Sequence, residues 1–235
     1  MVDVETALPK EIKENYAELH IHLEGALEPE LMVKFAKRNG VKLDTYDVEK
    51  IRAKYNFSNL QEFVDIICAG SETFMESEDY FEVCEAYFKR LQQTDCNQVE
   101  AFFCNKTQAP EGQNFSIPFE GVARSFKNSE QNYGIKSKLI YAFERHLGVE
   151  AANKCFDQMM EYIANAPADE QDLIIGVGLV SSEKPFPPAP YAGVYERARQ
   201  AGFNLTAHAG EEGGPDYIWS ALDDLGVSRI DHGVR

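Results

Sequence analysis

The stretch LIIGVGLVSSEKPFPPAPYAGVYERARQAGFNLTA, residues 173–207, contains one complete strand–helix–strand pattern. Residues 173–180 and 204–207 are short apolar or β-branched runs of strand length, and residues 191–200 between them form a segment of helix length. Two neighbouring strands that are joined through a helix run parallel, because the crossover returns the chain to the same edge of the sheet. The stretch therefore predicts an α/β protein with a parallel sheet.

The same alternation extends through the rest of the chain. Further strands are expected at 17–23, 98–103, 138–143 and 229–231, and further helices at 30–39, 58–67, 77–91, 149–164 and 216–225. Residues 25–95 are helical in pattern throughout and contain no Gly/Ser/Pro linker, which predicts a helical excursion after the first strand and not a separate domain. Residues 105–116 include Pro110 and Gly112 and are expected to form a surface loop.

Length and charge limit the domain organisation and the partners. The chain has 235 residues, close to the ~250 typical of one β/α barrel, so one domain over residues 1–235 is expected. The chain has 39 acidic and 23 basic residues, which give a net charge of −16. This charge repels a polyanion, whereas a neutral or cationic small molecule is not repelled. We therefore expect a small-molecule substrate and no nucleic-acid partner.

The cysteines and the apolar runs indicate the compartment. There are five cysteines, an odd number, and none forms a C-x-x-C pair, so neither a disulfide framework nor a thiolate zinc site is indicated. The amino terminus has no apolar run of signal-peptide length, and no later stretch reaches the ~20 apolar residues of a membrane span. These features favour the cytoplasm, with the nucleus as a further compartment, and they predict no membrane partner.

Histidines occur at the ends of the predicted strands. His20 and His22 lie two residues apart near the end of the first strand, so their side chains leave the same face and can converge on one metal ion. An H-x-H pair alone is equally compatible with packed or surface histidines. His208 and His232, however, lie at the ends of two later strands, and the carboxyl ends of the strands are where β/α barrels gather their active-site groups. The sequence therefore predicts a metal site.

One carboxylate and one further histidine also follow predicted strands. Glu211 follows His208 by three residues between glycines, and a carboxyl group in a dry site beside a metal can serve as an acid or a base; the alternative is a capped turn with solvated acids. The fifth histidine, His146, follows Glu144 and Arg145, and a packing or salt-bridge role is expected for it.

The motifs HIHLEG (20–25), HAGE (208–211) and DHG (231–233) resemble, in this order, the metal and catalytic signatures of the adenosine/adenine deaminase family. The segment GLVSSEKPFPP (178–188) resembles the adenine deaminase branch, particularly its fungal members. The resemblance covers essentially the whole chain. It implies a TIM-type (β/α)8 barrel, of which the chain contains about six of the eight strands.

The resemblance also implies the chemistry and the residues that perform it. One zinc ion is bound by His20, His22 and His208. Glu211 donates a proton, and His232 positions and deprotonates the attacking water; Ser181 and Ser182 contact the substrate. The implied reaction is hydrolytic deamination of a purine, with adenine giving hypoxanthine and ammonia; the alternative is adenosine giving inosine.

Departures from the family pattern keep other interpretations open. The second strand is followed by CNKTQ (104–108) where the adenine branch has an Asp-Pro run, and Val180 replaces the usual aspartate before Ser-Ser-Glu. The family's Ser-x-x-Asp-Asp-Pro motif does not occur before Arg235. We therefore expect residues 1–235 alone to be a poor catalyst that self-associates through open barrel edges. The alternatives are another metallohydrolase of similar barrel type and a non-catalytic remnant or binding protein.

Overall fold

Six parallel strands form one sheet in the computed structural model, which describes residues 15–58, 60–104 and 114–235. Neighbouring strands in the chain are also neighbours in the sheet, in the order β1 to β6. The strands are β1 (Tyr16–His22), β2 (Cys96–Phe103), β3 (Lys136–Glu144), β4 (Ile174–Val180), β5 (Asn204–Ala209) and β6 (Arg229–His232). All six strands expected from the sequence are therefore present, with ends that differ by at most two residues.

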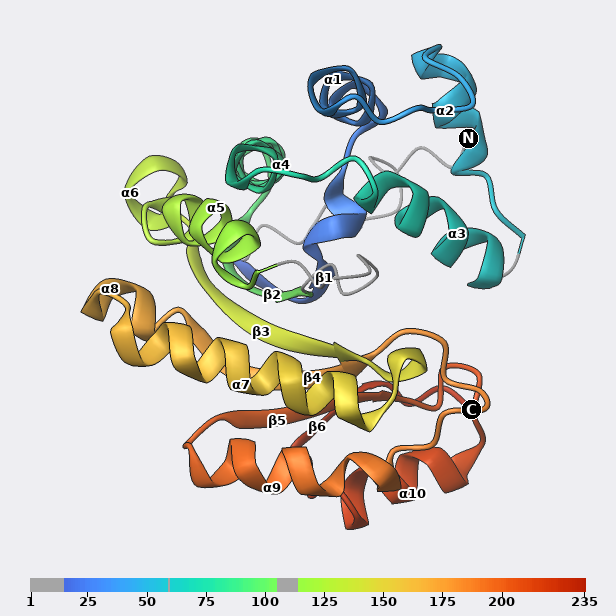
Figure 1. Cartoon of the computed structure of the whole chain (residues 1–235), viewed down its shortest axis with the longest axis vertical. Helices are drawn as coiled ribbons and strands as arrows, with labels where there is room; N and C mark the ends of the chain where they lie inside the picture. Colours follow the sequence, from blue (N-terminus) through green and yellow to red (C-terminus); the bar gives the residue numbers. More distant parts are fainter. Residues whose placement is uncertain (1–14, 59, 105–113) are drawn as a thin grey trace.

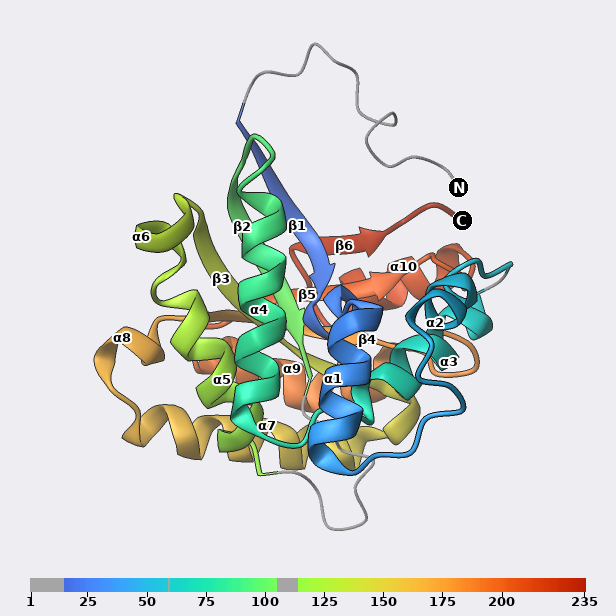
Figure 2. The same ribbon diagram turned by 90° about the horizontal axis from the view of Figure 1, so that it is seen from above.

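The strands form a curved sheet in the interior, and the helices pack around its outer face (Figures 1 and 2). Between β1 and β2 the chain forms α1 (Pro29–Asn39), α2 (Val48–Lys54), α3 (Leu60–Ser71) and α4 (Ser77–Leu91), which confirms the helical excursion. The later helices are α5 (Ser116–Phe126), α6 (Ser129–Tyr133), α7 (Val149–Asn165), α8 (Ala168–Gln171), α9 (Ala192–Gln200) and α10 (Pro215–Asp223). This arrangement is a TIM-type barrel with six of its eight strands.

Helix α5 is the main element that the sequence reasoning did not include. Its pattern is interrupted by Pro118 and Gly121, although a proline is tolerated in the first turn of a helix. Gly121 is required by packing, because a Cβ atom at this position would lie 2.0 Å from the backbone oxygen of Ser77 at the start of α4. The expected loop therefore ends at Phe115, and its residues 105–113 lie outside the described part of the chain.

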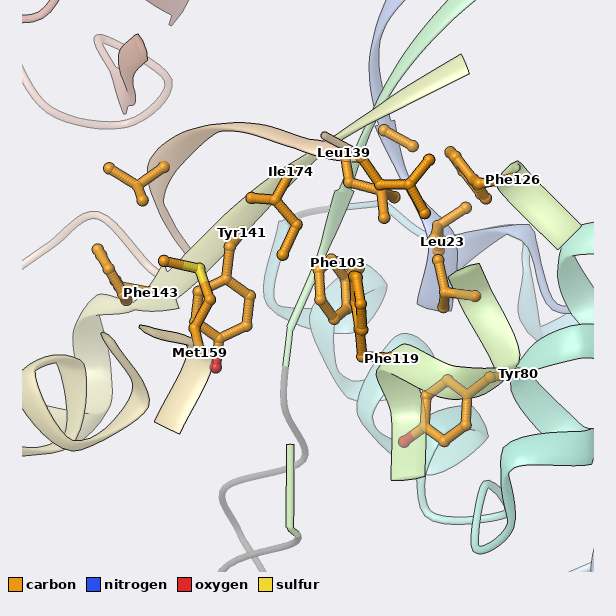
Figure 3. Packing of buried hydrophobic residues seen from close by; sticks show 14 of the residues in the cluster. Leu23, Tyr80, Phe103, Phe119, Phe126, Leu139, Tyr141, Phe143, Met159 and Ile174 are labelled. Atoms are coloured by element: carbon orange, nitrogen blue, oxygen red, sulfur yellow. The ribbon is translucent and has the colours of Figure 1, made fainter. Parts of the chain in front are cut away.

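Strands β2 to β5 bury side chains on both faces, as the near-continuous apolar runs of parallel strands require, whereas β1 has no fully buried residue. On the outer face, Tyr141, Phe143 and Phe103 pack with residues of the helices, such as Phe119 and Met159 (Figure 3). On the inner face, a separate small cluster fills the barrel, with Phe102, Ile140, Ala142 and Val180 as its buried members. This inner cluster forms the apolar layer beneath the ends of the strands.

The first and last described strands are not hydrogen-bonded to one another, since the described pairings run only from β1 to β6 in sequence order. Side chains at their carboxyl ends nevertheless approach closely: the ring centroids of His20 and His232 are 4.7 Å apart. All five cysteines are free thiols. Among the described residues, no helix combines the length and the apolar character that crossing a membrane requires.

Candidate active site

Four histidines meet at the carboxyl ends of three strands. His20 and His22 lie two residues apart near the end of β1 and therefore share one face of the strand. His208 lies near the end of β5, and His232 is the last residue of β6. The Nε2 atom of His208 lies 3.0 Å from Nε2 of His20 and 3.0 Å from Nε2 of His22. One potential ligand atom from each of His20, His208 and His232 also lies within 4.8 Å of the others. The structure therefore brings together all four histidines that the sequence places at strand ends.

The donor set fits a divalent transition metal. Each ring nitrogen of a neutral imidazole offers either one N–H or one in-plane lone pair, so Nε2 of His208 can form a well-directed hydrogen bond with only one of its two close nitrogen neighbours. Burial, followed by the charges of His20 and His232, lowers the pKa of His22 to about 3. Burial likewise holds the pKa of His208 well below its usual value. Neutral imidazoles that converge in this way are the ligands that zinc prefers.

The carboxylate of Asp231 lies behind the His208 ring, on the side away from the other histidines. The Nδ1 atom of His208 is buried without a hydrogen-bond partner among the described residues and lies 3.8 Å from Oδ2 of Asp231. Asp231 is itself buried; Thr206 donates a hydrogen bond to it through Oγ1, and Arg229 donates one through Nε at 3.0 Å. A carboxylate beside the outer nitrogen of a histidine orients the ring toward a metal. Asp231 is therefore suited to this orienting role.

Phe102 forms the apolar floor of the histidine cluster. Its ring stacks on His22 with the centroids 5.0 Å apart and meets His208 edge-on at 5.1 Å. It is fully buried in the inner cluster that also contains Val180. Sequence reasoning missed Phe102 and the contact of Asp231 with His208. The alternation of side chains along β2 is a signal for Phe102, because it turns Phe102 inward where Phe103 faces outward.

Glu211 lies beside His232, with its Oε2 atom 3.4 Å from Nε2 of that histidine. Burial, together with the negative charges of Glu183 and Glu212, raises the pKa of Glu211 to about 7. The carboxyl can therefore carry a proton near neutral pH, as a general acid must. His232 has a φ of +88°, which is unusual for a residue other than glycine and occurs where a site constrains the backbone.

The end of β4 carries the residues expected to contact a substrate. Ser181 and Ser182 are half-buried, and Ser181 has a φ of +78°. The Oγ atom of Ser181 lies 2.7 Å from Nδ1 of the half-buried His146, so this histidine forms a hydrogen bond that the sequence reasoning did not include. Val180 points into the inner apolar cluster. The pair formed by Ser181 and His146 links the end of β4 to the residues that follow β3.

The end of β2 is described only in part. The backbone N–H of Cys104 donates a hydrogen bond of 2.8 Å to Oε1 of Glu24. Glu24 belongs to the HIHLEG motif, and burial raises the pKa of its carboxyl to about 7. The remainder of the CNKTQ segment, including Gln108, lies outside the described residues.

Comparison with known proteins identifies the family. Residues 16–235 match the family model described as adenosine deaminase. The chain is 44% identical over 229 residues to the adenine deaminase of Acinetobacter baylyi, covering 97% of this chain and 65% of the relative. It is 43% identical to the adenine deaminase of Pseudomonas fluorescens, covering 100% of this chain and 70% of the relative. The chain thus spans about two thirds of the length of these curated relatives.

Solved structures give the same result. The crystal structure of adenine deaminase from Arthrobacter aurescens superimposes with a TM-score of 0.85 at 36% identity, covering 93% of this chain and 64% of that one. An amidohydrolase from Burkholderia ambifaria, solved with bound zinc, superimposes with a TM-score of 0.80 at 25% identity, covering 93% of this chain and 58% of that one. From its sequence match, its barrel and its relatives, the chain belongs to the adenosine deaminase family.

Proposed function

We propose that the protein containing this chain is a zinc-dependent purine deaminase that converts adenine and water into hypoxanthine and ammonia. The observation that carries the proposal is the convergence of His20, His22 and His208 at 3.0 Å contacts, with Glu211 and His232 beside them. The relatives described above that are named adenine deaminases support adenine as the substrate. The activity is proposed for the whole protein, because the chain spans about two thirds of those relatives.

One zinc ion would be bound by His20, His22 and His208. Three neutral histidines are a sufficient ligand set for a catalytic zinc site, which keeps a further position open. When bound, zinc supplies the Lewis acidity that makes a water molecule an effective nucleophile near neutral pH. The solved zinc-containing amidohydrolase supports the choice of metal.

Glu211 and His232 would move the protons. With a pKa of about 7, Glu211 is protonated often enough to donate to a ring nitrogen of the purine, which makes the amino-bearing carbon more electrophilic. Burial lowers the pKa of His232, so its neutral ring can orient the attacking water and accept a proton from it. The added oxygen stays on the purine, and the amino group leaves as ammonia.

Adenosine, which would give inosine, is the competing substrate, as the description of the family model indicates. Ser181 and Ser182 are proposed to contact the purine from the end of β4. The test is ammonia release by the zinc-loaded, full-length protein, with adenine and adenosine compared at equal concentrations. We expect kcat/KM to be at least about tenfold higher for adenine, a discrimination of about 1.4 kcal/mol.

A preference for adenosine contradicts the nucleobase assignment. Ammonia release from neither purine by protein that contains one zinc per chain contradicts the proposed reaction and favours a non-catalytic binding protein. A matched Glu211→Gln protein serves as the control for contaminating deaminases.

The remaining proposals concern partners and compartment. The net charge of −16 supports a small purine and not a nucleic acid as the partner. The edges of β1 and β6, which are not paired with one another in the described part of the chain, are a proposed route to self-association of residues 1–235. Five free cysteines support a reducing compartment, so we place the protein in the cytoplasm, with the nucleus as a further compartment.

A further inference from the structure

One buried carboxylate, that of Glu183, binds the whole loop that carries Glu211. Its Oε1 atom accepts a hydrogen bond of 2.7 Å from the backbone N–H of Gly210. Its Oε2 atom accepts three more, from the N–H groups of Glu211 at 3.0 Å, Glu212 at 2.7 Å and Gly213 at 2.6 Å. Four consecutive amides therefore point at one side chain that has no exposed surface.

The loop is shaped to admit this carboxylate. A Cβ atom on Gly213 would lie 2.7 Å from Oε1 of Glu183 and 2.6 Å from Cγ of Tyr217, so only glycine leaves room there. Gly210 has a φ of +72°, a left-handed conformation that glycine adopts without strain. Gly213 is thus required by the approach of Glu183 and Tyr217, whereas Gly210 is required by its left-handed backbone and by the nearby side chain of Ile218.

A buried guanidinium lies close enough to favour the ionised form of this carboxylate. Arg145 has no exposed surface, and its three guanidinium nitrogens have no hydrogen-bond partner among the described residues. Burial alone would raise the pKa of Glu183, but the amide hydrogen bonds and the charge of Arg145 lower it overall. A buried charge is tolerated when hydrogen bonds and an opposite charge compensate it, and Glu183 has both.

We propose that Glu183 is a positioning residue for Glu211, which holds the loop 210–213 in the conformation that directs the acid toward the metal site. The proposal rests on the proposed function of Glu211 as the proton donor. Glu183 reaches the loop from the segment after β4, 27 residues or more before its amide partners in the chain, so it connects two strand ends. The negative charge of Glu183 also favours the protonated form of Glu211, which a neutral anchor would not do.

The test replaces Glu183 by glutamine, which keeps the size of the side chain but turns an acceptor oxygen into an amide nitrogen. In the zinc-loaded, full-length protein, we expect amide hydrogen exchange at residues 210–213 to become at least about tenfold faster, because hydrogen bonds that protect these amides are lost. We expect kcat to fall by at least about tenfold with KM and zinc content unchanged, because Glu211 is displaced while the metal ligands stay in place.

Glu212→Gln is the matched control. This variant makes the same chemical change in a carboxylate of the same loop. The Glu212 side chain is exposed and takes part in none of the four hydrogen bonds to Glu183, so amide exchange at 210–213 should stay as in the wild type. If Glu183→Gln yields too little folded protein, Glu183→Asp keeps the charge, shortens the side chain by one methylene and is measured in the same way. Wild-type exchange at 210–213 in a folded Glu183 variant overturns the proposal.

The two proposals fail in different ways. If the zinc-loaded wild type deaminates neither purine, the proposed function fails, whereas the exchange measurement still reports whether Glu183 holds the loop. If the wild type is active and Glu183→Gln has both faster loop exchange and an unchanged kcat, the loop is held by Glu183 but Glu211 does not depend on it. That result also overturns the positioning role.

Discussion

Replacing Glu211 by glutamine removes the ionisable proton while keeping nearly the same shape. Burial and the charges of Glu183 and Glu212 raise the pKa of this carboxyl from 4.5 to about 7. At pH 7 a group with a pKa of about 7 is about half protonated, whereas one with the ordinary value is protonated in roughly one molecule in 300. The surroundings of Glu211 therefore increase its acid form by roughly 150-fold.

The variant is expected to lose about 100-fold or more in kcat at pH 7, because an amide cannot donate this proton. In the wild type, the raised pKa keeps the acid neutral below about pH 7. Turnover that depends on its proton should therefore be constant on the acid side of pH 7 and fall about tenfold for each pH unit above it.

The assay is ammonia release from adenine between pH 5 and 9 by the zinc-loaded, full-length wild type and variant, with zinc content measured on the same samples. Equal zinc content in the two proteins shows that the variant has lost the acid and not the metal. A wild-type turnover that increases between pH 7 and 9 would refute the reasoning. A Glu211→Gln protein with normal turnover would do so too.

Three further predictions concern the metal site and its support. Changing His20, His22 and His208 together to alanine should reduce zinc from one equivalent per chain to background in metal analysis; the same zinc content in both proteins contradicts the site. Asp231→Asn should weaken zinc affinity by ~10-fold to 100-fold in a chelator competition, because the carboxylate behind His208 is lost; wild-type affinity contradicts its orienting role. Phe102→Ala should lower the free energy of unfolding by about 3–5 kcal/mol in chemical denaturation, since its fully buried ring leaves a cavity under the histidines; a loss under 1 kcal/mol argues against this packing.

The strands could be predicted from the sequence because each is a local pattern. The run LIIGVGLV forms β4 from Ile174 to Val180, and the run around NLTA forms β5 from Asn204 to Ala209. Helix α5 was missed because its proline and its glycine weaken the local helical pattern. The reason for Gly121, its close approach to Ser77 of α4, is a contact between segments that no local pattern contains.

The meeting of the histidines was predictable for a geometric reason. In a parallel barrel, the carboxyl ends of all strands face the same side, so residues at those ends share one site however far apart they are in the chain. His20 and His208 are separated by 188 positions and lie 3.0 Å apart. Residue type and position at a strand end were sufficient for this prediction.

The sequence by itself thus determined the order of the strands, the side of the barrel that carries the site and the residue types gathered there. The tertiary structure alone decided that Phe102 lies under the histidines and that Asp231 lies behind His208. It also decided that Glu183 accepts hydrogen bonds from four backbone amides of the Glu211 loop. It also decided that Glu211 carries a pKa of about 7. The physical reason is that burial and electrostatic interaction depend on which groups surround a side chain in space, and these groups come from strands that are distant in the sequence.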